Sequence, residues 1–145
     1  MTWEPRGEEQ AELDAAFAEA ERTVGTAFAR AVQPFGVTPR APQYGSNPNE
    51  SISRWVEWWL DLADPHDSLS CELLLLEDPE GPFVSARIAV WRYLGHGFSD
   101  SDDLWHSGEH RVGTPGQAAM VLRASSEALA RQLAELDLSQ FFRTD

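Results

Sequence analysis

Apolar residues recur at three- and four-residue steps from Glu8 to Val32, which is the spacing of one face of an α-helix. The segment also holds eight alanines, which favour helix by intrinsic propensity. The pattern therefore predicts a long helix over 8–32, whose apolar stripe consists of Leu13, Phe17, Ala20, Val24, Phe28 and Val32.

Proline and glycine break this periodicity after the helix, at Pro34, Gly36, Pro39, Pro42, Gly45 and Pro48. A loop is predicted over about 33–50, a length at which loops are often functional or mobile. The next stretch, 52–63, fits two patterns. Val56, Trp58 and Leu60 alternate as in a strand, whereas Ser53, Glu57 and Asp61 recur every four residues as on a helix. A strand is favoured for 52–63 because turn signals follow it in the sequence.

Two Asp-Pro pairs, Asp64-Pro65 and Asp78-Pro79, provide those turn signals, and Asp78-Pro79-Glu80-Gly81 fits a type I turn. Between and beyond them lie two alternating apolar runs, which predict adjacent strands at the centre of a sheet. The segment 95–113 is polar and rich in glycine, with a possible short fourth strand at 110–112. The two runs are Leu69, Cys71, Leu73, Leu75 and Val84, Ala86, Ile88, Val90.

Thr114-Pro115-Gly116-Gln117 resembles a capping box, with Pro at the first helical position. A second helix is predicted over about 115–136, after which Phe141 and Phe142 tuck onto the body. The expected fold is a single α+β domain over 1–145: an N-terminal helix, an antiparallel meander of three to four strands over about 52–112, and a C-terminal helix packed on the sheet.

The net charge of the chain limits the classes of partner that it is expected to bind. Its 145 residues include 24 Asp and Glu against 11 cations, a formal net charge of -13. Such a field repels nucleic-acid phosphates and anionic lipid and favours basic partners, so direct nucleic-acid or membrane binding is not expected. Every cation is Arg, which fits a GC-rich coding bias and excludes Schiff-base lysine chemistry and the P-loop lysine.

The apolar runs, the acidic residues near the start and the single cysteine indicate the cellular location and the redox chemistry of the chain. The longest uninterrupted apolar run, Leu73 to Leu76, is far too short to cross a bilayer. The first thirty residues carry acids where a signal peptide needs an apolar run, so a cytoplasmic location is expected. Cys71 is the single cysteine and is expected to pack as a small hydrophobe.

Catalytic and metal-binding patterns are weak. His106-Ser107-Gly108-Glu109-His110 has the order of inverted zinc-protease motifs, but that site needs a helix and Gly108 argues for a polar loop. A looser metal site from His96, His106 and His110 stays open, while no metal or cofactor is assigned. No nucleophile elbow, phosphate loop or dinucleotide fingerprint occurs. No catalytic residue is therefore assigned.

Aromatic residues give a stronger signal. Trp55, Trp58 and Trp59 fall within five residues, so at least one indole must point away from the others. Trp91 and Tyr93 share the strand face of Arg87, opposite the apolar face. Two interpretations remain open: these rings pack beneath the first helix or the long loop, or they form a protein interface.

We expect a non-catalytic acidic protein-binding module, such as an immunity or inhibitor protein that neutralises a basic partner, or a small chaperone-like protein. The predicted element order loosely resembles that of type III secretion chaperones. The expected anchors are Trp59, Trp91 and Tyr93, with steering charges from Asp100, Asp102 and Asp103, in a chain that can also form a homodimer. The alternative is a small enzyme or ligand-binding domain with a pocket between the sheet and the loop 33–48, lined by Tyr44, Trp58, Arg87 and His96.

Overall fold

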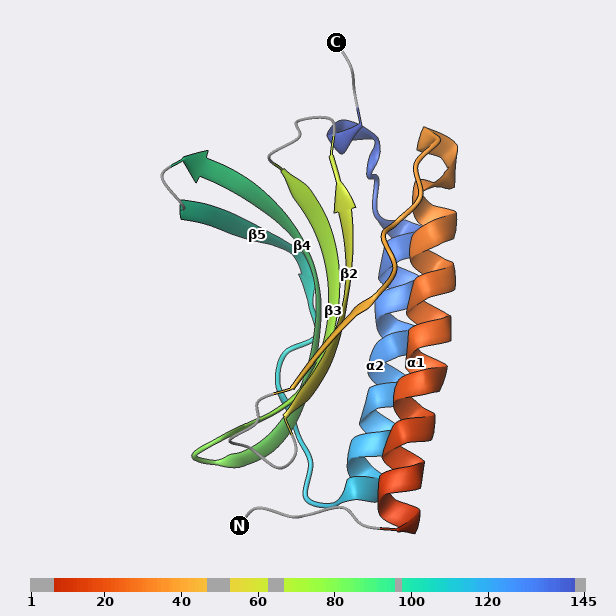
Figure 1. Cartoon of the computed structure of the whole chain (residues 1–145), viewed down its shortest axis with the longest axis vertical. Helices are drawn as coiled ribbons and strands as arrows, with labels where there is room; N and C mark the ends of the chain where they lie inside the picture. The colour runs from red at the N-terminus through yellow and green to blue at the C-terminus, as the bar shows by residue number, and fades with distance from the viewer. Residues whose placement is uncertain (1–6, 47–52, 63–66, 96–97, 143–145) are drawn as a thin grey trace.

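The computed structural model describes residues 7–46, 53–62, 67–95 and 98–142. Two helices that run in the same direction lie against one face of a long, curved antiparallel sheet (Figure 1). The predicted α+β class is thus confirmed, with an N-terminal helix, an antiparallel sheet and a C-terminal helix on the sheet. The elements are α1 (Glu8–Val32), η1 (Gln33–Phe35), β1 (Gln43–Ser46), β2 (Arg54–Asp61), β3 (Ser68–Asp78), β4 (Gly81–Gly95), β5 (Phe98–His106), β6 (His110–Arg111), α2 (Pro115–Glu135) and η2 (Ser139–Phe141).

The strands follow one another across the sheet in the order β1-β2-β3-β4-β5, and β6 pairs with the start of β4. The strand predicted at 52–63 and the short one at 110–112 are confirmed as β2 and β6. Two strands were not predicted: β1 lies inside the expected loop, and β5 lies inside the polar segment 95–113. Both are outer strands of the described sheet, which places fewer of their side chains in the core and weakens the apolar alternation that reveals a strand.

The β3–β4 turn confirms the sequence signal at Asp78-Pro79. Asp78 and Gly81 are register partners at the start of the ladder, and the Asp78 carboxylate accepts a hydrogen bond from the amide of Glu80 (2.8 Å). Gly81 adopts a φ of 116°, which an L side chain rarely tolerates. The other expected turn, Asp64-Pro65, lies outside the described residues.

The core lies between the helices and the sheet face that they cover. All six positions of the predicted α1 stripe are buried, and the two apolar runs of β3 and β4 are buried opposite them. Cys71 is part of this layer, and burial raises the pKa of its thiol, so it packs as a small hydrophobe.

The C-terminal helix begins and ends as its signals predict. Thr114 Oγ1 accepts from the amide of Gln117 (3.1 Å), and Gln117 returns a bond by accepting from the amide of Gly113 (2.6 Å). Beyond α2, Phe142 stacks on Phe35 with ring centroids 4.5 Å apart, which confirms that the chain end tucks onto the body. In the described part of the chain, no helix has the length and apolarity required to cross a bilayer.

Candidate functional site

The sheet face turned away from the helices, here called the open face, is the candidate site. Strands β3 and β4 are curved so that this face lies on the inside of the curve (Figure 1). Because side chains alternate along a strand, the residues between the buried apolar ones point here. Polar and aromatic side chains distinguish this face from the core, although apolar residues such as Leu74 also lie on it: β3 contributes Ser70 and Glu72, and β4 contributes Ser85, Arg87 and Trp91.

Aromatic rings gather at one end of the open face. Trp59 on β2 and Trp91 on β4 pack with ring centroids 5.8 Å apart at an interplanar angle of 45°. Each indole N–H is satisfied locally: Trp91 donates to Ser70 Oγ and Trp59 to Glu57 Oε2, both at 2.9 Å. The ring edges are therefore held in place while part of each ring stays accessible. Trp91 is also contacted by the guanidinium of Arg87, 5.1 Å from its centroid.

A charged row crosses the middle of the open face beside these rings. Glu57, Glu72 and Arg87 are register partners on three successive strands. Arg87 donates to both carboxylate oxygens of Glu72, and its Nη1 lies 3.4 Å from Oδ1 of Asp103 on β5. The hydrogen bond that Arg87 donates to Glu72 is the main reason that the pKa of Arg87 is raised. Two carboxylates, Glu72 and Asp103, contact one guanidinium while Glu57 acts on it only by its charge, so the row has an excess of negative charge.

The Glu72–Arg87 pair is unusual because the Glu72 side chain is only 7% exposed although no helix covers this face. Arg87 on the adjacent strand contacts both carboxylate oxygens of Glu72. Removing a carboxylate from water is costly unless its oxygens are bonded, so Arg87 is required to stabilise Glu72 here. From the sequence, Arg87 was expected beside the aromatic residues or in the alternative pocket, and Glu72 was not singled out. The available signal was the pair of polar residues, Ser70 and Glu72, at alternate positions of an apolar strand.

The structure divides the six predicted binding residues between the two faces. Trp59, Trp91, Tyr93 and Asp103 belong to the open face, where the Tyr93 side chain is 49% exposed. Asp100 and Asp102 pair in register with Arg92 and Val90, so they stand on the side of β5 that faces the helix layer. The acidic run lies in the segment 95–113, for which only a short strand at 110–112 was predicted, whereas residues 100–103 are part of strand β5.

The expectation that the aromatic rings lie beneath the first helix or the long loop is not met for Trp59 and Trp91. Their sequence neighbours Trp58 and Val90 are buried beneath the helices, so strand alternation turns Trp59 and Trp91 to the other face. Trp58 lies against α1, where a Cβ on Gly25 would stand 3.4 Å from its Nε1. The cluster of three tryptophans is thus divided by strand alternation: Trp58 is in the core and Trp59 on the open face.

The alternative pocket is not assembled as expected. Tyr44 is 66% exposed and donates its hydroxyl hydrogen bond to Glu21 of α1, Trp58 is in the core, and Arg87 is on the open face. The fourth expected residue, His96, lies outside the described residues.

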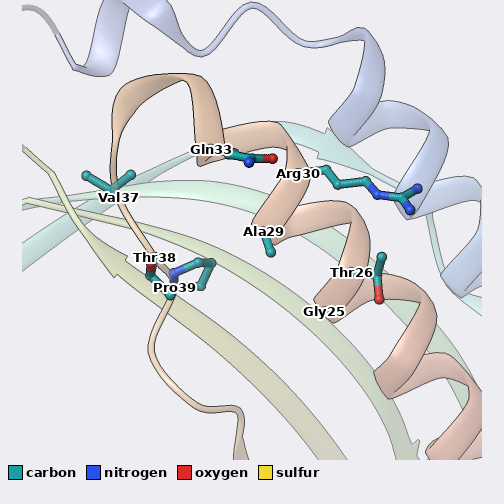
Figure 2. Close-up of a pocket in the computed structure, with 8 residues that line it drawn as sticks. All are labelled: Gly25, Thr26, Ala29, Arg30, Gln33, Val37, Thr38 and Pro39. Atoms are coloured by element: carbon teal, nitrogen blue, oxygen red, sulfur yellow. The ribbon is translucent and has the colours of Figure 1, made fainter.

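A groove of about 480 Å³ does exist between α1 and the segment that follows η1 (Figure 2). Its charged side chain, Arg30, extends away from Val37 and Pro39 in this view. The lining carries no carboxylate, histidine or thiol, so its described residues offer no acid–base pair: Gly25, Thr26, Ala29, Arg30, Gln33, Val37, Thr38 and Pro39.

The histidine motif lies on a turn between two strands. His106 ends β5, His110 begins β6, and Gly108 between them has a φ of 81°. Nδ1 of His106 accepts from the amide of Gly108 (2.8 Å), so a neutral ring carries its proton on Nε2, which faces Ser85 Oγ at 3.3 Å. This ring donates to the serine and is not placed to accept its proton. Among the described residues, no three His, Cys, Asp or Glu side chains are grouped to hold a metal ion.

Comparisons with protein-family models, curated protein sequences and solved structures gave no significant match. A function for this chain must therefore be inferred from its own geometry.

Proposed function

We propose that the chain is a non-catalytic protein-binding module whose open face binds a basic surface of a partner protein. Such a module acts as an immunity or inhibitor protein or as a small chaperone. The observation that carries the proposal is the Trp59–Trp91 pair, held at 5.8 Å on a sheet face without a covering helix and beside an excess of carboxylates. Tryptophan and tyrosine are the commonest anchors of protein interfaces.

The two parts of the face have different roles in this proposal. Trp59, Trp91 and Tyr93 are preordered rings that exchange water for apolar contact, and they determine how long the partner stays bound. Asp103 and Glu57 supply negative charge that Arg87 does not balance, which attracts arginine and lysine. The net charge of -13 extends this attraction beyond the contact distance.

The experiment is capture of a partner from native lysate on the tagged chain at low and moderate salt, followed by binding kinetics with the purified partner. A Trp59→Ser/Trp91→Ser variant is compared with Tyr44→Ser, which removes an exposed aromatic ring from β1. We expect the double variant to raise the dissociation rate at least tenfold, while Tyr44→Ser changes it less than twofold.

Charge is tested separately. Asp103→Asn should slow association and weaken its dependence on ionic strength, with little effect on dissociation. The proposal fails if no basic protein is captured. It also fails if the captured protein binds the Trp59→Ser/Trp91→Ser variant as well as it binds the unmodified chain.

A further inference from the structure

Strand β5 forms one outer edge of the described sheet. The strand has nine residues, Phe98–His106, and pairs with β4, and no other described strand pairs with it. The other edge strand, β1, has four residues. A long edge strand presents a row of backbone N–H and C=O groups to any chain that arrives in an extended conformation.

A groove lies beside this edge on the helix side. It measures about 460 Å³ and separates the end of β5 from the outer flank of α2. Met120, 68% exposed, and Ala124 line it from the helix, and Trp105 lines it from the strand. Trp105 pairs in register with Ile88, so its ring is on the same side of β5 as the core. An extended segment added to β5 would place its helix-side residues against this groove.

The remaining positions on that side of β5 are acidic. Asp102 and Asp100 pair with Val90 and Arg92, and a bulge between Ile88 and Ala89 separates them from Trp105. Arg92 partly neutralises Asp102 at 2.6 Å. The Asp100 carboxylate accepts from the amide of Ser101 (3.0 Å), which holds it along the strand. The helix side of the edge therefore offers two carboxylates followed by an apolar groove.

The negative charge of β5 favours a basic segment over a second copy of the chain at this edge. A second copy of the chain, added symmetrically about the middle of β5, would bring Asp100, Asp102 and Asp103 of both chains together, and like charges across a strand pair are destabilising. A basic segment is attracted to the same positions.

We propose that a partner binds by adding an extended basic segment to the free edge of β5, with arginine or lysine beside Asp100 and Asp102 and an apolar side chain in the groove beneath Trp105 and Met120. This inference rests on the proposed function and identifies the form of the basic partner that the chain recognises. It also gives a role to the two predicted aspartates that the open face does not use.

The probe is a capped, fluorescently labelled peptide, Thr-Leu-Thr-Arg-Thr-Arg-Thr, together with the same residues in reverse order, because a strand can add in either direction. A backbone-methylated twin lacks alternate N–H donors but keeps the side chains. Binding is measured by anisotropy with the full chain. We expect one of the two directions to bind, and its methylated twin to bind at least tenfold more weakly.

The matched variants are Ala124→Arg, which fills the groove with a bulky cation, and Ala134→Arg, which adds the same side chain to α2 away from it. Both positions are exposed on the helix, so both variants are expected to fold. Ala124→Arg should weaken peptide binding at least tenfold and Ala134→Arg less than twofold. Trp59→Ser/Trp91→Ser should leave peptide binding within twofold.

The inference is overturned if neither peptide binds, if the methylated twin binds equally, or if Ala124→Arg has no effect. It is also overturned if sedimentation shows a dimer that Ala124→Arg dissociates, since the occupant is then a second copy. A captured partner separates this inference from the proposed function. If the captured partner still binds Ala124→Arg but no longer binds Trp59→Ser/Trp91→Ser, only the edge addition is contradicted. If the partner still binds both variants, the proposed function is contradicted as well.

Discussion

Strands β3 and β4 supply two sheet faces that differ most at their centre. On the covered face, Leu73 and Ile88 are fully buried among apolar neighbours. On the open face, Glu72 and Arg87 form an ion pair, and Trp91 donates to Ser70. Residues one step apart in sequence thus enter different environments, because a strand turns successive side chains to opposite sides. The covered face supplies stability from apolar burial, and the open face holds the groups that a partner can recognise.

The largest test of this difference compares adjacent leucines of β3. Leu73→Ala removes a fully buried side chain and should reduce the free energy of unfolding by about 2–5 kcal/mol. Leu74→Ala, on the half-buried open side, should cost about 1 kcal/mol or less. Urea denaturation of both variants measures the contrast. Equal losses would show that the open face is packed like the core.

A second test concerns the buried ion pair. Glu72→Met should destabilise the chain by about 1–3 kcal/mol, because Arg87, whose side chain is 24% exposed, loses its main acceptor. Adding Arg87→Met should restore part of that loss, since neither charge then remains to be paired. A double-mutant cycle by urea denaturation gives the coupling. Strictly additive effects would contradict the assigned pairing.

Two glycines beside tryptophans sharpen the comparison further. A Cβ on Gly45 of β1 would lie 2.1 Å from the Trp55 ring on the open face, so Gly45→Ala should cost about 1–3 kcal/mol. Gly25 is inside α1, and its Cβ would meet Trp58 at an ordinary 3.4 Å. Gly25→Ala should therefore stabilise by about 0.5–1 kcal/mol through helix propensity. Thermal unfolding of the two variants measures both changes in stability. A change of the same sign in Gly45→Ala and Gly25→Ala would refute this account.

The smallest expected effect is the pH dependence of an exposed pair at the β3–β4 turn. Hydrogen bonds from Arg111 hold the pKa of Asp78 below its ordinary 3.8 in the folded chain. Its stabilising contribution is therefore complete above that value and is lost as pH falls through the lower folded pKa. Asp78→Asn should flatten the acid side of the stability profile slightly, as urea midpoints across acidic pH would show. An unchanged slope would exclude this linkage.

Sequence periodicity predicted the helices and central strands because their buried faces are long and regular. Helix α1 has the predicted bounds, and the strand preferred for 52–63 is β2. The outer strands β1 and β5 escaped prediction because their polar sequences carry no such pattern. Trp91 and Tyr93 were predicted to share a strand face with Arg87, and Trp59, which was predicted only as an anchor, lies on that same face. The Glu72–Arg87 pair and the groove beside Trp105 were not found.

The sequence by itself determined which residues alternate, where the helices begin and end, and that the chain is acidic, since these are properties of neighbours along the chain. Only the tertiary structure decided which residues lie on the face that the described helices cover, and it placed Trp59 and Trp91 on the other face. Register across strands likewise brought Arg87 between Glu72 and Asp103, and placed Asp100 and Asp102 on the other side of the sheet. Those outcomes depend on contacts between distant segments, which local spacing does not specify.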